Sequence, residues 1–280
     1  MASESTLSTF VASDGDNIAI QDWPIEKSQA LRGVVLIVHG LGEHAGRYDR
    51  VANRLNAWGF AVRGYDLYGH GESGGARGGM PNDSRMLDDL ADIMDSTRKQ
   101  LKPGCPLILL GHSLGGLIAG RFVSLKQRPV DALVMSSPAL DPALNAFQKF
   151  LLAVLPAIAP NLRVSNDLDI SKISHDSAVV SAYRSDKLIH DRISARLAKF
   201  IADAGLATLA NAGQWSTPTL LMYAGQDKLV APSGSKAFEA AAPKKVVTTR
   251  CFEDLYHEIF NELDAEPVFA ELKTWLDARF

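Results

Sequence analysis

The stretch LILLGHSLGG, residues 107–116, places a serine between glycines directly after a run of aliphatic residues. Its centre, GHSLG at 111–115, matches the pattern G-x-S-x-G; the residues before it suit a buried strand, and those after it have helical spacing. A serine on such a sharp strand-to-helix turn needs small residues two positions away, because larger ones would collide with the neighbouring elements. We therefore predict that Ser113 is a nucleophile exposed at the carboxyl end of a strand. The alternative is that the glycines only allow close helix packing beside a capping serine.

Other segments repeat the character of that strand. Short, almost continuously apolar runs are separated by segments with helical spacing: GVVLIV, FAVRGY, PLILL, DALVMS, TPTLLMY and KVVTTRCF. Runs without alternation are typical of strands that are covered on both faces, as in a parallel sheet wrapped by helices. Two further runs, LSTFVAS and NIAIQDW, flank a turn signal at residues 13–16 and predict a hairpin. The sequence thus predicts an α/β fold with a mostly parallel eight-stranded sheet flanked by helices.

One connection is much longer than the others. About eighty residues separate the strand ending near Ser137 from the next one near Thr217, far more than an ordinary connection with one helix. We predict a helical cap at 139–213, inserted after the sixth strand, with 1–138 and 214–280 as the core. Its first half (145–160) is apolar, and its second half (181–212) has the pattern of an amphipathic helix. Neither half reaches the length that a bilayer-spanning helix requires.

The overall composition is typical of a water-soluble globular protein, and the length is sufficient for an enzyme. Its 280 residues are 46% hydrophobic and 22% charged, with a formal net charge of −3. No block of like charges is present, so nucleic acid is not an expected partner. Cys105 and Cys251 lack the spacing of a metal site or a disulfide framework, and the first thirty residues lack the pattern of a secretory signal. We expect a cytoplasmic protein that requires neither a metal nor an organic cofactor.

A serine hydroxyl needs a base, and the base needs an orienting acid. His257 follows the last predicted strand and Asp227 the penultimate one, so both should lie at the carboxyl edge of the sheet, where ligands of open α/β sheets bind. The chain order Ser113, Asp227, His257 is that of the α/β-hydrolase fold. Asp141 is the second candidate for the acid. A structural role for His257, capping the final helix, is the alternative for the base.

The developing oxyanion of an acyl-transfer reaction needs hydrogen-bond donors. The sequence HGLG at 39–42 follows the strand GVVLIV and can bring the backbone N–H of Leu41 near the serine, and the N–H of Leu114 follows Ser113 directly. The alternatives for this loop are a plain glycine turn or a phosphate-binding loop, but it lacks the spacing and the lysine of a nucleotide site. The second glycine-rich stretch, 69–75, is expected to shape the backbone beside the site.

Five segments together resemble the monoacylglycerol lipase and lysophospholipase group of serine α/β-hydrolases. They are HGLGEHAGRY (39–48), GYDLYGHGESGGARG (64–78), GHSLGG (111–116), YAGQDKLV (223–230) and YHEIFNE (256–262). The resemblance extends from about residue 33 to the end of the chain. It implies a triad of Ser113, Asp227 and His257, with an oxyanion hole at Leu41 and Leu114, in agreement with the chain order. Leu41 departs from the small residue often found there, which leaves the backbone donor intact.

Within the predicted cap, residues 183–188 resemble a Tyr-x-Ser-Asp-Pro-Leu stretch of that group, with Lys187 in the proline position. Tyr183 is therefore a candidate for binding a glycerol-like head group; a half-buried cap tyrosine would look the same. Glu43 and Arg47 are four residues apart and can pair to brace the oxyanion loop, although a solvated pair has the same spacing.

These features predict a serine carboxylic-ester hydrolase, a monoacylglycerol lipase that releases a fatty acid and glycerol through an acyl-serine intermediate. The apolar stretch LLAVLPAIA at 151–159 favours a channel for an acyl chain and shallow contact with lipid surfaces, whereas a buried cap core would give the same pattern. The alternatives are a lysophospholipase, a short-chain carboxylesterase, an aminopeptidase relative and a non-catalytic hydrolase-like binding module.

Overall fold

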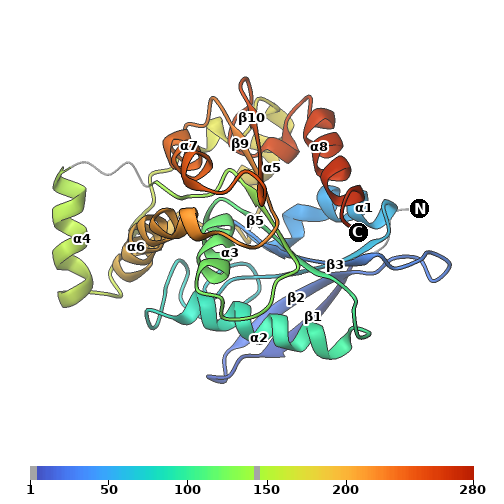
Figure 1. The fold of residues 1–280 in the computed structure, drawn as a ribbon. Coiled ribbons are helices and arrows are strands. Elements are labelled where there is room, and N and C mark those ends of the chain that lie inside the picture. The colour runs from blue at the N-terminus through green and yellow to red at the C-terminus, as the bar shows by residue number, and fades with distance from the viewer. Residues whose placement is uncertain (1–4, 142–145) are drawn as a thin grey trace.

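A computed structural model of the chain describes residues 5–141 and 146–280 (Figure 1). Its centre is an eight-stranded sheet with the strand order β1-β2-β4-β3-β5-β6-β9-β10. The strands are β1 (Thr6–Val11), β2 (Asn17–Trp23), β3 (Gly33–Val38), β4 (Phe60–Tyr65), β5 (Leu107–His112), β6 (Ala132–Ser136), β9 (Thr219–Ala224) and β10 (Val247–Phe252). The β1–β2 and β2–β4 pairs are antiparallel, and every other neighbouring pair in this sheet is parallel. The predicted hairpin and mostly parallel sheet are confirmed.

Helices cover both faces of the sheet. Within the described residues they are α1 (Asp49–Ala57), α2 (Arg85–Gln100), α3 (Leu114–Ser124), α4 (Ala146–Ile158), α5 (Ser177–Ser185), α6 (Ala195–Asn211), α7 (Pro232–Ala241) and α8 (Glu266–Asp277), with short 3-10 turns at Ala45–Tyr48, Ile170–Lys172, Ala212–Gln214 and Ile259–Asn261. One core cluster packs α2, α3, α6 and α7 against the sheet, and the other packs α1 and α8 against its opposite face.

The central strand β3 shows why the buried runs lack alternation. Val34, Leu36 and Val38 enter the first core cluster, while Val35 and Ile37 enter the second. Successive side chains of a strand point to opposite faces, so a strand covered on both sides must be apolar at every position. All six residues of β3 are buried.

The insertion after β6, residues 139–213, contains α4, α5, α6 and a two-stranded antiparallel ribbon of β7 (Arg163–Ser165) and β8 (Arg192–Ser194). Residues 142–145 at its start lie outside the described residues. Helix α6 packs against α3, and α4 lies beyond α6, away from the sheet (Figure 1).

The prediction of one amphipathic helix over 181–212 is wrong. Helix α5 ends at Ser185, and the Asp186 carboxylate then accepts a hydrogen bond from the Leu188 N–H in a local turn that competes with helical bonding. After β8, the Ser194 hydroxyl accepts a hydrogen bond from the Leu197 N–H and begins α6 as its N-cap. Pairing of β8 with a strand almost thirty residues earlier leaves no periodic signal in the local sequence.

No helix within 5–141 or 146–280 is both long and apolar enough to cross a bilayer.

Candidate active site

Ser113 lies at the sharp turn between β5 and α3. Its backbone has φ 53° and ψ −117°, a region that non-glycine residues rarely occupy. The glycines on either side allow this turn: a Cβ added to Gly111 would overlap the carbonyl of Gly115, and one added to Gly115 would overlap the carbonyl of Val38. The turn therefore depends on both small residues, and it puts the serine at the carboxyl end of β5.

A buried imidazole and carboxylate meet near the same edge. His257 Nδ1 lies 2.6 Å from Asp227 Oδ2, although the residues come from different loops, after β10 and β9. Because the carboxylate accepts this bond, Nδ1 carries the hydrogen and Nε2 is left as an acceptor. Burial alone would raise the pKa of Asp227, but His257 and the backbone N–H groups of Leu229 and Val230 outweigh it and lower that pKa.

The imidazole of His257 lies beside the residue that precedes the serine. The ring of His112, directly before Ser113, has its centroid 4.7 Å from that of His257. Within the described residues the Ser113 hydroxyl makes no hydrogen bond. Asp141, the second candidate acid, lies elsewhere and accepts a hydrogen bond from the Ser233 hydroxyl at 2.7 Å.

The loop with Leu41 reaches the serine turn. A Cβ added to Gly40 would lie 3.3 Å from the Cβ of Ser113. His39 fixes this loop: its Nδ1 donates to the Gly40 carbonyl at 2.8 Å, and its Nε2 accepts from the Leu67 N–H at 2.9 Å. Leu41 is half-buried, and Leu114 is the first residue of α3, where backbone N–H groups have no helical acceptor. The loop with Leu41 and the first turn of α3 therefore both adjoin Ser113.

A buried ion-pair network braces the same loop. The Glu43 carboxylate accepts hydrogen bonds from the Gly40 N–H (2.6 Å) and the Tyr48 hydroxyl (2.7 Å), and it pairs with Arg47. The predicted Glu43–Arg47 pair is thus confirmed. Arg47 also holds Glu258, next to His257, by two hydrogen bonds of 2.7 and 2.8 Å. Burial opposes ionisation of Glu43, but Arg47 overrides it and lowers the pKa to about 2.

The insertion contacts this network directly. The Arg47 guanidinium lies 4.6 Å from the centre of the Tyr183 ring, and Asp186 lies 2.8 Å from His44 Nε2. In addition, the His190 N–H donates to the Gly42 carbonyl at 2.9 Å. Sequence reasoning missed Glu258 and His190, because each meets its partner across more than 140 residues and no local motif records the contact.

Several histidines near the site are held neutral. Burial, followed by the charge of His257, lowers the pKa of His112 to about 3. Burial, followed by Arg77, lowers the pKa of His190 to about 4, and burial lowers that of His70 well below its usual value. A histidine whose pKa is lowered in the folded state takes up protons more readily when the chain is unfolded.

We therefore expect the free energy of unfolding to fall as the pH drops below 6.5, the usual pKa of histidine. The stabilisation that comes from keeping these histidines neutral is complete above pH 6.5 and is lost as the pH falls toward 4. Between pH 7 and pH 4 the loss from His112 alone is about 3 kcal/mol of unfolding free energy. Urea unfolding at pH 7, 5.5 and 4 measures this, and His112→Gln should give a shallower dependence. An equally steep dependence in both proteins would contradict the assignment to His112.

The chain is similar to known proteins over most of its length. The family model described as serine aminopeptidase, S33, matches residues 29–264. A monoacylglycerol lipase from Mycolicibacterium smegmatis is 32% identical over 272 residues, covering 96% of this chain and 95% of that protein. An uncharacterized abhydrolase domain-containing protein from Dictyostelium discoideum is 32% identical over 280 residues; it is longer, and the match spans 98% of this chain but 29% of that protein.

Among solved structures, a monoacylglycerol lipase from Paleococcus ferrophilus has a TM-score of 0.83 and 31% identity to this chain. The match covers 99% of this chain and 100% of that structure. The likeness therefore extends over the sheet and the insertion together.

Proposed function

This chain belongs to the serine aminopeptidase S33 family, within the α/β-hydrolase fold, and from that premise we propose that it hydrolyses monoacylglycerols with Ser113, His257 and Asp227 as its catalytic residues. The observation that carries the proposal is the buried His257–Asp227 hydrogen bond of 2.6 Å beside the strained serine turn. It supplies a base with a free Nε2 at the place where a hydroxyl needs one.

The reaction takes place in two steps on this site. His257 Nε2 accepts the proton of the Ser113 hydroxyl while the oxygen attacks the ester carbonyl, and the N–H groups of Leu41 and Leu114 stabilise the oxyanion. The imidazolium then gives that proton to the departing glycerol oxygen, which leaves an acyl-serine. In the second step His257 removes a proton from water while the water oxygen attacks the acyl carbon; the serine oxygen then leaves, takes the proton from His257, and the acyl group is released as the fatty acid. Asp227 keeps Nδ1 protonated and stabilises the imidazolium throughout.

An apolar cavity of about 350 Å³ in the insertion suits the acyl chain. Leu151, Leu152 and Leu155 of α4 line one side, and Ala198 and Ile201 of α6 line the other. Its rim includes Asn166, whose side-chain nitrogen would lie 3.8 Å from a Cβ added to Gly42 of the oxyanion loop. One residue of the cavity lining therefore lies near the loop that contains Gly42. We propose on this basis that residues 139–213 act as a cap over the core, with Tyr183 on the alcohol side.

An aminopeptidase activity is not favoured by the charges around the site. A substrate ammonium would need a carboxylate that is available to bind it. Glu43 and Glu258, the buried carboxylates beside the oxyanion loop and His257, are both held by Arg47. Both carboxylates thus already have the guanidinium of Arg47 as a partner, and neither is left unpaired for a substrate ammonium.

The substrate class is tested by a rate series on monoacylglycerols of increasing acyl length, beside lysophosphatidylcholine and p-nitrophenyl acetate. Because each buried methylene adds about 0.8 kcal/mol, we expect kcat/KM to rise about fourfold per methylene until the groove is filled. Rates highest on lysophosphatidylcholine would instead make the enzyme a lysophospholipase. Activity confined to the acetate would make it a short-chain esterase.

The outer surface of the insertion supports reversible contact with lipid. Phe150 and Ile158 on α4 and Leu162 after it are 61%, 73% and 48% exposed, and an exposed apolar helix face favours a membrane surface. We expect the protein to float with liposomes and Ile158→Asp to float less. Wild-type protein that stays in the soluble fraction would contradict the membrane contact.

The cysteines Cys105 and Cys251 are both unpaired, which is consistent with a reducing cytoplasmic location.

A further inference from the structure

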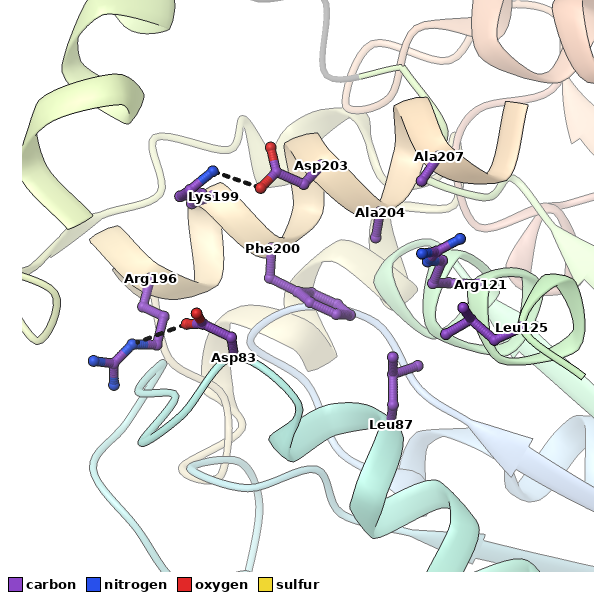
Figure 2. Close-up of a pocket in the computed structure, with 10 residues that line it drawn as sticks. All are labelled: Asp83, Leu87, Arg121, Leu125, Arg196, Lys199, Phe200, Asp203, Ala204 and Ala207. Carbon is purple, nitrogen blue, oxygen red and sulfur yellow. Dashed lines mark hydrogen bonds and ion pairs between the residues drawn. The ribbon is translucent and has the colours of Figure 1, made fainter. Parts of the chain in front are cut away.

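A second cleft lies outside the proposed catalytic site, where α6 passes the end of α3 and the first turn of α2 (Figure 2). Its volume is about 270 Å³. The floor is apolar: Leu87 and Ala204 are buried, Phe200 lies between the helices, and Leu125 remains 40% exposed at the rim. This surface can therefore cover a short alkyl chain.

The charges around the floor do not balance. Arg196 donates to the Met80 carbonyl at 2.9 Å and lies 3.3 Å from Asp83, and Lys199 pairs with Asp203 at 2.5 Å. Arg121 differs from both. Its guanidinium donates to the Ser124 hydroxyl at 3.2 Å, and no carboxylate within residues 5–141 and 146–280 pairs with it. One positive charge is thus left without an acidic partner next to an apolar surface.

The combination selects one kind of ligand. A guanidinium binds a carboxylate through paired, charge-assisted hydrogen bonds, and the floor favours hydrocarbon. The volume accommodates about nine groups of the size of a water molecule, which corresponds to a carboxylate with a chain of medium length. We propose that this cleft binds the anion of a medium-chain fatty acid, with the carboxylate at Arg121 and the chain over Phe200 and Ala204.

Helix α6 connects this cleft to the groove proposed for the acyl chain. Phe200 and Ala204 face the cleft, whereas Ala198 and Ile201 on another side of the same helix line the groove. A fatty acid is the product of the proposed reaction, so the identification of this ligand as a product of the enzyme rests on the proposed function.

Isothermal titration calorimetry with octanoate tests the binding without requiring turnover. We expect octanoate to bind the wild type and to bind Arg121→Met about tenfold or more weakly, because the variant keeps an unbranched stem but loses the charge. Lys126→Met, an exposed cation near the cleft but outside its lining, should stay within twofold. Acetate has the carboxylate without the long alkyl chain, and 1-octanol has the chain without the carboxylate. Each should bind at least tenfold more weakly than octanoate.

A further variant separates the two cavities. Ala198→Trp fills the groove and should keep octanoate binding within threefold of the wild type. Equal binding to Arg121→Met and the wild type, loss of binding in Ala198→Trp alone, or no binding to the wild type would each overturn the proposal. Thermal unfolding of each variant without ligand shows that it is folded. An enzyme that fails to hydrolyse monoacylglycerols but binds octanoate through Arg121 would contradict the proposed function and leave this site standing.

Discussion

Replacing Ser113 by alanine should lower kcat for a monoacylglycerol by about 10⁴- to 10⁶-fold. The substitution removes the oxygen that forms the acyl intermediate, while the oxyanion donors and the groove remain and leave a small residual rate. Alanine occupies the same turn with the same backbone strain, so the free energy of unfolding should change by less than about 1 kcal/mol. Steady-state kinetics and urea unfolding measure the two effects.

Ser233→Ala is the matched control for that variant. It removes the same hydroxyl from a serine that is bonded to Asp141, the second candidate acid. Its rate should stay within about threefold of the wild type. A Ser113→Ala enzyme with more than a few per cent of the wild-type rate would mean that another residue carries the chemistry.

The second large effect is expected from Asp227→Asn, with a loss of about 10⁴-fold in kcat at neutral pH. The amide can donate a hydrogen bond to Nδ1 of His257, which moves the imidazole hydrogen to Nε2. A protonated Nε2 cannot accept the proton of Ser113, although the shapes of the two side chains are nearly identical. KM should change little, because Asp227 is buried and its carboxylate is bonded to His257 Nδ1.

Asp141→Asn tests the alternative acid with the same chemical change. Because Asp141 is bonded to Ser233 and the His257 imidazole to Asp227, this variant should retain a rate within about threefold of the wild type. The reverse pattern, with Asp141→Asn inactive and Asp227→Asn active, would reassign the acid.

The sheet and the turn at Ser113 could be predicted from the sequence because their causes are local. Residues of β3 alternate between two covered faces, which forces an uninterrupted apolar run. Gly111 and Gly115 are required by clashes with their immediate surroundings, so the five-residue pattern carries its own structural reason. Asp227 and His257 follow β9 and β10, whose carboxyl ends lie at the same edge of the sheet because the strands are parallel. Chain order is therefore sufficient to identify them as candidate acid and base.

The remaining features depend on distant parts of the chain. The pairing of β7 with β8, the second ion pair of Arg47 with Glu258, and the bond from His190 to Gly42 all join residues far apart in sequence. None of them changes the composition or periodicity of the segment in which it lies. Their positions depend on how distant segments of the chain pack together, which only the three-dimensional structure provides.

A fluorophosphonate probe reports whether His257 makes the Ser113 hydroxyl nucleophilic. We expect a single covalent adduct on the wild-type protein, located on Ser113 by peptide mass spectrometry. Ser113→Ala should form no adduct, and His257→Gln should be labelled slowly. An unlabelled wild type, or an adduct that persists in Ser113→Ala, would show that Ser113 is not the activated nucleophile.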